Sequence, residues 1–93
     1  MKENTIEIRF RKEIEKLGGW CPKWVSPGND GVPDRIAVLP GGRVIFVELK
    51  GDGGELSPVQ LLQIRRLLLL GQEVWVIDSI ELIKQFLDGV QAA

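Results

Sequence analysis

The spacing of apolar and polar positions divides this 93-residue chain into helical and extended segments. Apolar residues recur three or four apart between residues 4 and 17, which predicts a helix that buries Ile6, Phe10, Ile14 and Leu17 and stops at Gly18-Gly19. β-Branched and apolar runs predict strands over residues 20–25, 35–39, 43–47 and 73–77, the first weakened by its proline. Further helices are predicted over residues 58–70 and 82–87. The order α-β-β-β-α-β-α indicates an α/β domain with a central mixed sheet flanked by helices.

The second and third predicted strands form a hairpin around Pro40-Gly41-Gly42. The register that places Leu39 opposite Arg43 also places Asp34 opposite Glu48. Opposed side chains on one face of a sheet have Cβ atoms about 4.5–5.5 Å apart, where two carboxylates repel each other. A cation is therefore expected between them. The two-residue period of a strand puts Lys50 on the face of Glu48, while Leu49 and the apolar residues before it point to the other face.

Two carboxylates and an ammonium group on one ribbon suit metal-assisted cleavage of a phosphodiester. Hard oxygen ligands with room for water favour Mg²⁺ or Mn²⁺, and Lys50 could orient the water or stabilise developing negative charge. The alternative is a surface ribbon whose charged side chains are merely solvated. The opposition of Asp34 to Glu48 favours the metal site, because a purely structural sheet should avoid that pairing.

Composition limits the number of domains and the kinds of catalytic or metal site that the chain could contain. With 93 residues and 44% apolar content, the chain predicts a single domain over residues 1–93. One cysteine and no histidine exclude an internal disulfide, a histidine base, histidine-ligated zinc and a Ser-His-Asp triad. The chain has no apolar run that could span a bilayer and no signal-peptide pattern, so we expect a cytoplasmic protein.

Charge is distributed unevenly along the chain. The net charge of −1 argues against a polycation that coats nucleic acid. Residues 1–50 nevertheless carry nine Lys and Arg against seven Asp and Glu. Four cations of the first predicted helix are candidates for phosphate contacts, and a solvated helix face explains them equally well: Arg9, Arg11, Lys12 and Lys16.

The predicted helix over residues 58–70 has a strong start signal and an unusual apolar pattern. Ser57, Pro58 and Gln60 form a capping box with proline in the first turn. Leu61, Ile64 and Leu68 fall on one side, and Val59, Leu62, Leu69 and Leu70 fall on the other. A helix that is apolar nearly all round must be covered twice. The second cover could be a partner subunit, the sheet or a neighbouring helix.

Two further pairs of residues have two interpretations each. Glu3 and Glu7 both lie at or near the apolar stripe of the first helix, so either could be a third acidic group beside a metal. Trp20 and Trp24 are more readily explained as core or edge packing than as base-stacking platforms.

Several motifs together resemble the stand-alone VRR-NUC domain, a branch of the PD-(D/E)XK nuclease superfamily with the restriction-endonuclease-like fold. They are Gly31-Val32-Pro33-Asp34-Arg35, Val47-Glu48-Leu49-Lys50, Leu56-Ser57-Pro58-Val59-Gln60 and Leu70-Gly71-Gln72-Glu73-Val74. The resemblance implies that Asp34, Glu48 and the Leu49 carbonyl bind Mg²⁺ or Mn²⁺. It also implies that Lys50 acts on the attacking water and that Gln60 has an active-site role. Of the two acids on the first helix, the resemblance favours Glu7 over Glu3.

The resemblance also carries an expectation about the substrate. Stand-alone members are similar to small phage-type nucleases that act as homodimers on branched DNA, including four-way (Holliday) junctions. The alternatives are a nuclease on flaps, nicks or linear duplex, and a non-catalytic DNA-binding or interaction module.

Overall fold

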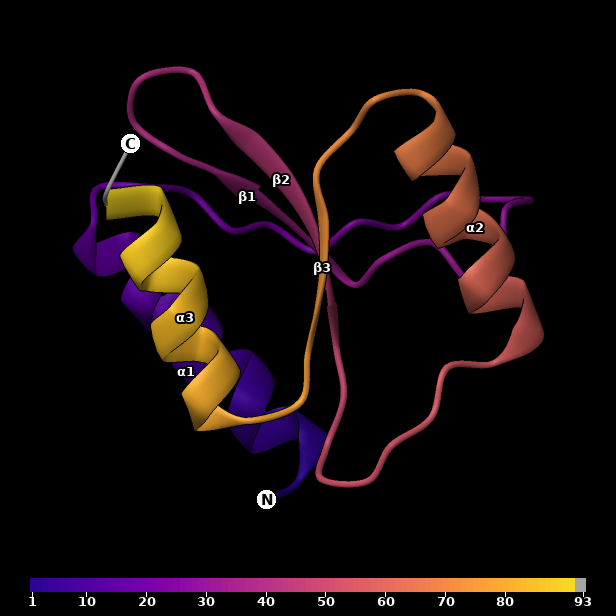
Figure 1. Cartoon of the computed structure of the whole chain (residues 1–93), viewed down its shortest axis with the longest axis horizontal. Coiled ribbons are helices and arrows are strands. Elements are labelled where there is room, and N and C mark those ends of the chain that lie inside the picture. The colour runs from indigo at the N-terminus through magenta and orange to yellow at the C-terminus, as the bar shows by residue number, and fades with distance from the viewer. Residues whose placement is uncertain (92–93) are drawn as a thin grey trace.

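The computed structural model describes residues 1–91, so the last two residues of the predicted single domain, 92 and 93, lie outside the described part. Within residues 1–91 the elements are α1 (Glu3–Lys16), β1 (Arg35–Val38), β2 (Val44–Leu49), α2 (Pro58–Leu69), β3 (Val74–Ile77) and α3 (Ile80–Gln91). The sheet forms a middle layer, with α1 and α3 on one side and α2 on the other (Figure 1). The α/β class and the mixed sheet between helices are confirmed.

The sheet has the order β1-β2-β3, with β1 antiparallel and β3 parallel to β2. The hairpin pairs Arg35 with Val47 and Val38 with Val44, which is the register predicted from the Pro40-Gly41-Gly42 loop. The parallel pairing of β2 with β3 requires a long crossover connection, and α2 provides it. The central strand therefore presents one face to α1 and α3 and the other to α2.

The predicted first strand over residues 20–25 is wrong as a strand. This segment runs beside β1 but makes only two isolated bridges, Trp20 with Val38 and Lys23 with Arg35. The physical reason is Pro22, whose carbonyl accepts a hydrogen bond from the Ile36 amide at 3.1 Å but which has no N–H to return one. The ladder is broken at its centre. Within residues 1–91 the sheet has three strands instead of the four expected.

The core lies between the sheet and the α1–α3 pair. The predicted stripe of α1 is confirmed for Ile6, Phe10 and Ile14, which are fully buried, whereas Leu17 follows the helix and is only partly buried. The Phe86 ring on α3 packs edge-on against Phe10, with ring centroids 5.0 Å apart, and against Trp75 of β3 at 5.2 Å. This aromatic contact joins the two helices to the sheet.

The capping box of α2 is confirmed, but most of the apolar residues expected to be covered on its two sides are exposed within residues 1–91. The Gln60 amide donates to Ser57 Oγ at 3.2 Å, and Gln60 Oε1 accepts from the Ser57 amide at 2.9 Å. Ile64 and Gln63 are buried, whereas Leu61, Leu68, Leu62, Leu69 and Leu70 are exposed. The buried Gln63 side chain donates a 3.0 Å hydrogen bond to the Asp30 carbonyl.

The last helix is longer than predicted. It begins at Ile80, where Ser79 Oγ accepts a 3.1 Å hydrogen bond from the Leu82 amide, and it continues through Gly89 to Gln91. Gly89 does not stop it, because Val90 beyond it packs against the core and supports another turn. None of the helices within residues 1–91 has the length and apolar character needed to cross a membrane.

We predict that Phe86→Ala lowers the free energy of unfolding by about 3–5 kcal/mol, because it leaves a cavity where α1, α3 and β3 meet. Val25→Ala is the control, since Val25 is exposed and should lose less than about 0.5 kcal/mol. Urea denaturation of both variants measures the difference. Equal losses would show that the aromatic contact is not the centre of the core.

Candidate active site

Asp34 and Glu48 meet where the hairpin strands end on the α2 side of the sheet. Asp34 comes directly before β1, and its Oδ2 atom accepts a 2.9 Å hydrogen bond from the Leu49 backbone amide. Glu48 lies on β2 and is only 1% exposed. Neither carboxylate oxygen of Glu48 has a hydrogen-bond partner within residues 1–91. The predicted pairing of two acids is therefore present, and one of them is buried without a partner.

Burial controls the protonation of Glu48. Loss of hydration, followed by interaction with the neighbouring Asp34 carboxyl group, raises the pKa of Glu48 from 4.5 to about 9, and the charge of Lys50 opposes this change. A carboxylate in this setting is stabilised only when a cation replaces the lost hydration. The site thus has an unmet requirement for positive charge.

The donor atoms fit a small, hard divalent cation. Asp34 and Glu48 provide carboxylate oxygens, which Mg²⁺ and Mn²⁺ favour over nitrogen or sulfur. Leu49 could contribute only its backbone carbonyl, because its hydrocarbon side chain has no donor atom and packs in the core. No three Asp, Glu, Cys or His side chains within residues 1–91 converge as a metal cage. Such a sparse set leaves coordination positions for water and substrate, as Mg²⁺ sites usually do.

Lys50 follows β2 directly and is held beside Glu48. Its backbone amide donates to the Ile77 carbonyl at 2.9 Å, which ties the end of β2 to β3. The turn from Gly51 to Gly54 closes with a 2.9 Å hydrogen bond and folds against the Lys50 side chain. A Cβ atom at Gly54 would lie 3.2 Å from Lys50 Cβ, so the turn has little room for a larger residue. This packing restricts where the ammonium group can reach.

Gln60 is brought near the carboxylate pair by the packing of α2 on Gly31. Gly31 has a φ of +82°, and a Cβ atom there would lie 2.8–2.9 Å from backbone atoms of Val59 and Gln60. Only glycine permits this close approach. The first turn of α2 therefore rests on the segment that leads into Asp34. The Gln60 side chain itself is used in the capping box.

Glu7 and Glu3 occupy different positions on α1. Glu7 forms a half-buried ion pair with Arg35, with 2.9 Å between Glu7 Oε2 and Arg35 Nε. Glu3 is exposed, and its backbone lies against Gly51, the residue after Lys50. Neither joins Asp34 and Glu48 in a three-carboxylate cluster within the described chain.

Arg35 is a residue whose importance the sequence reasoning missed. Its Nη1 atom donates to the Cys21 carbonyl at 2.8 Å, and its side chain is buried on the core face between α1 and the sheet. Strand alternation could have revealed it, since an arginine at a core-facing position requires partners. The buried Cys21 beside it has its pKa raised to about 11, chiefly by desolvation, and remains a thiol.

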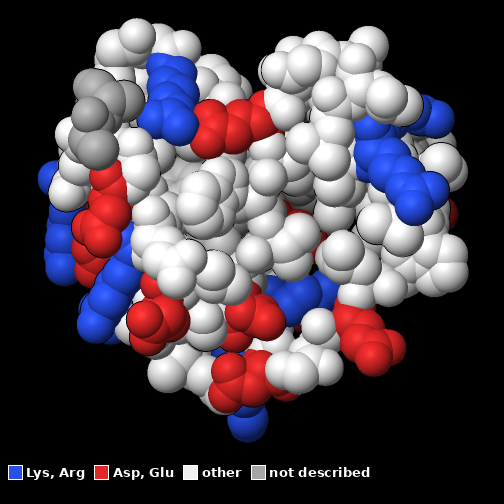
Figure 2. Space-filling model, in the orientation of Figure 1, with Lys and Arg blue, Asp and Glu red and all other residues white. Residues whose placement is uncertain are grey.

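Most cations of α1 have partners on the same helix. Arg9 and Lys16 pair with Glu13, and Arg11 pairs with Glu15, at 3.0–3.2 Å. Lys12 is exposed and makes no ion pair within residues 1–91. Figure 2 shows Lys and Arg interspersed with Asp and Glu on the viewed face, with no broad basic patch there. The predicted phosphate-binding role of Arg9, Arg11, Lys12 and Lys16 stays a prediction.

Comparison with known proteins gives a consistent result. "Putative nuclease p44" of Acyrthosiphon pisum secondary endosymbiont phage 1 is 46% identical over 82 residues, covering 88% of both chains. A solved structure described as a VRR_NUC domain matches with a TM-score of 0.86 at 27% identity, covering 95% of this chain and 96% of the other. A scan against protein-family models gave no match.

We predict that Glu48→Gln stabilises the metal-free protein at pH 8 by about 1–3 kcal/mol, because the amide cannot ionise and so removes the proton release that favours unfolding. The pKa of Glu48 is higher in the folded chain, so its contribution to stability is present below pH 4.5 and is lost as the pH rises toward 9. The advantage of the variant should therefore shrink at pH 5.

Chemical denaturation in EDTA at both pH values measures this effect. Glu55→Gln, which changes an exposed carboxylate in the following loop, is the matched control and should show little change. A destabilised Glu48→Gln protein at pH 8 would contradict the assigned environment of Glu48.

Proposed function

This chain belongs to the VRR-NUC family of nucleases, and from that premise we propose that it is a metal-dependent DNA endonuclease with Asp34, Glu48 and Lys50 at its active site. The observation that carries the proposal is the buried Glu48 carboxyl group, which lies next to Asp34 and has no hydrogen-bond partner within residues 1–91. A structural carboxyl group in this position would be costly, whereas a cation-binding one has a reason to be there.

Asp34 and Glu48 would hold Mg²⁺ or Mn²⁺, with the Leu49 carbonyl as an additional ligand. When bound, such an ion polarises the scissile phosphate and lowers the pKa of the attacking water. The hydrogen bond from the Leu49 amide fixes Asp34 Oδ2 and leaves Oδ1 for the ligand role. Because that amide belongs to the strand that carries Glu48, the same bond fixes the two acids relative to each other.

Lys50 would act on the water and on the phosphate. Its ammonium group can donate hydrogen bonds to an attacking water and to a phosphate oxygen, and it carries the charge that stabilises the transition state. Hydrolysis then forms a new bond from the water oxygen to phosphorus and breaks the ester bond to one sugar oxygen, which takes up a proton. The turn over Lys50 supports this role because it limits the positions of the side chain.

Gln60 and Glu7 have supporting roles in this proposal. Gln60 lies in the first turn of α2, close to the segment that carries Asp34, and can contribute once its capping contact opens. Glu7 acts through Arg35, whose ion pair and hydrogen bond to Cys21 hold the start of β1 next to Asp34. Glu7 is therefore proposed as a positioning residue.

The proposed substrate is branched DNA, in particular a four-way junction cut by a homodimer. Support for dimerisation comes from α2, where Leu62, Leu69 and Leu70 are 55%, 89% and 70% exposed. Contiguous apolar surface of this kind usually marks an interface. A twofold dimer repeats its active site at a fixed separation, which matches the symmetric strands of a junction.

Two alternatives are separable by experiment. A nuclease that cuts flaps, nicks or linear duplex equally well would show the chemistry without the junction preference. A non-catalytic DNA-binding module would show no metal-dependent cleavage. A panel of junction, flap, nicked and linear substrates with Mg²⁺ or Mn²⁺ decides among them.

We predict that Asp34→Asn lowers the cleavage rate at least about 100-fold and weakens Mn²⁺ binding, because it removes half of the anionic ligand set. Lys50→Ala should lower the rate by a similar factor but leave Mn²⁺ affinity nearly unchanged, since its role concerns water and phosphate. Single-turnover cleavage and metal titration of each variant separate the two effects. Wild-type cleavage rates for both variants would show that the active site does not lie on the β1–β2 hairpin.

We predict that the protein sediments as a dimer at micromolar concentration and that Leu69→Glu converts it to a monomer, because the charge would be buried in the interface. Val25→Glu is the control, since Val25 is exposed outside α2. A monomeric wild-type protein that cuts both strands of a junction in one encounter would refute the paired-site mechanism and leave the nuclease chemistry intact.

A further inference from the structure

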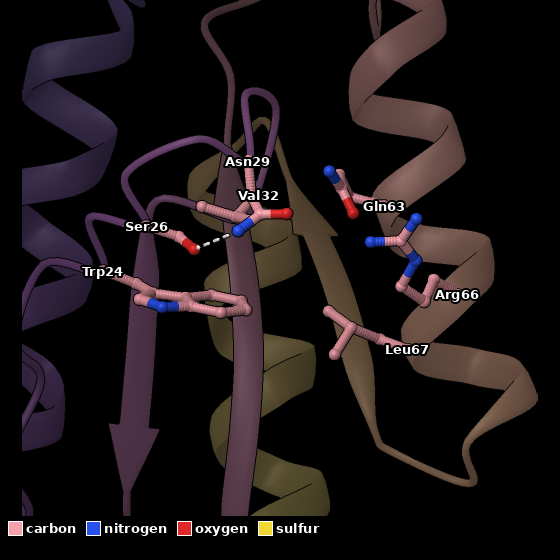
Figure 3. Close-up of a pocket in the computed structure, with 7 residues that line it drawn as sticks. All are labelled: Trp24, Ser26, Asn29, Val32, Gln63, Arg66 and Leu67. Carbon is pink, nitrogen blue, oxygen red and sulfur yellow. Dashed lines mark hydrogen bonds between the residues drawn. The ribbon is translucent and has the colours of Figure 1, made fainter.

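A cavity of about 210 Å³ opens between the segment of residues 24–32 and α2 (Figure 3). The segment contributes Trp24, Ser26, Asn29 and Val32, and α2 contributes Gln63, Arg66 and Leu67. The three helix residues are three and four positions apart, so they share one face of α2. Arg66 lies at the edge of this face, where it also borders the exposed leucines Leu62, Leu69 and Leu70.

Trp24 links the cavity to the carboxylate pair. The Trp24 amide donates to the Asp34 carbonyl at 2.9 Å, and the Trp24 ring lies 5.2 Å from the ring of Phe46. Phe46 precedes Glu48 by two residues and therefore points to the same face of β2, roughly 7 Å along the strand. The cavity and the carboxylate pair thus lie on the same side of the sheet.

Two amide side chains, Gln63 and Asn29, line the cavity and have acceptor oxygens free of hydrogen bonds within the described residues. Gln63 is only 7% exposed, and its Nε2 atom donates to the Asp30 carbonyl at 3.0 Å. Its Oε1 atom makes no hydrogen bond within the described residues, and Figure 3 shows the side chain directed toward the segment opposite. Asn29 donates from Nδ2 to Ser26 Oγ at 3.0 Å, which leaves its Oδ1 atom as a second acceptor.

The remaining lining residues provide an apolar surface and a cation. Trp24, Val32 and Leu67 are apolar, and the indole of Trp24 extends toward Leu67 (Figure 3). Arg66 makes no ion pair among residues 1–91, and its guanidinium group is directed toward the cavity (Figure 3). An aromatic ring, an arginine and two amide acceptors are the groups that bind a nucleotide through its base, its phosphate and its exocyclic amino group.

We propose that this cavity is a subsite for one unpaired base of the DNA strand, next to the scissile phosphate. The assignment rests on the proposed nuclease function, because the neighbouring carboxylates identify the strand that would pass here. The volume is below the roughly 300–1,000 Å³ of sites that enclose drug-sized ligands, and it suits a single flat ring system. Trp24 stacks on the base, Gln63 and Asn29 accept from its amino group, and Arg66 binds an adjacent phosphate.

The subsite has a direct consequence for substrate choice. A base within a continuous duplex is stacked and paired, so it must be extruded before it can enter. An unpaired base at a branch point, gap or single strand enters without that cost. The cavity thus favours DNA with unpaired nucleotides next to the cut and provides a physical basis for structure selectivity.

The test measures binding and does not require cleavage. A short single-stranded oligonucleotide containing 2-aminopurine is titrated with the full-length protein in EDTA, and fluorescence reports stacking of the base. The wild-type protein should quench the fluorescence. Trp24→Leu should abolish quenching and weaken single-strand binding by about 10-fold, whereas Trp24→Phe should retain part of both.

A second test compares Arg66→Gln with a control variant, Arg65→Gln, on the same helix. Arg66→Gln should weaken binding and lower the slope of log affinity against log salt by about one, because one phosphate contact is lost. Arg65→Gln removes the same charge from a neighbouring position that does not line the cavity, and it should have a smaller effect on both measurements.

The outcomes separate this proposal from the nuclease function. If Trp24→Leu quenches and binds like the wild type, or Arg65→Gln matches Arg66→Gln, the subsite is refuted even when Asp34→Asn still abolishes cleavage. If quenching depends on Trp24 but no divalent metal supports cleavage, the base-binding site holds and the nuclease function fails. Displacement of the oligonucleotide by an equal concentration of free dAMP would overturn the assignment to a base within a strand.

Discussion

The burial of Glu48 beside Asp34 is the constraint on which the rest of this structure depends. A carboxyl group that is 1% exposed and lacks hydrogen bonds within the described chain costs stability as long as the site holds no cation. Its surroundings keep it in place. The Leu49 amide fixes Asp34, the Lys50 amide ties the strand end to β3, and the close contact between Gly31 and α2 encloses the acids from the other side.

The opposite face of the same strand explains how the fold tolerates this cost. Ile45, Val47 and Leu49 are fully buried against α1 and α3, so alternate residues of β2 supply the core and the site. The pair formed by Glu7 and Arg35 lies on the core side and supports the first residue of β1. One face of the hairpin thus packs in the core, and the other face carries the candidate active site.

The sequence predicted the parts of this arrangement that depend on local rules. Hairpin register followed from the loop at residues 40–42, and the capping box and the stripe of α1 followed from spacing. The misses have two causes. Pro22, which the sequence marks as weakening the first strand, interrupts the ladder completely, and the burial of Gln63 depends on a hydrogen bond to a carbonyl 33 residues away. The ion pair of Glu7 with Arg35 could not be predicted either. Helix periodicity shows toward which side Glu7 points, but it does not identify the residue that lies on that side.

Calorimetric titration of the protein with Mn²⁺ in two buffers of different ionisation enthalpy tests whether Glu48 binds the cation. Since the pKa of Glu48 is raised to about 9, the carboxyl group is protonated at pH 7.5 and must release that proton when the cation binds. We expect release of about one proton per Mn²⁺, with affinity that rises with pH and is lost in Glu48→Gln. Binding that is independent of pH and equally strong in Glu48→Gln would contradict this expectation.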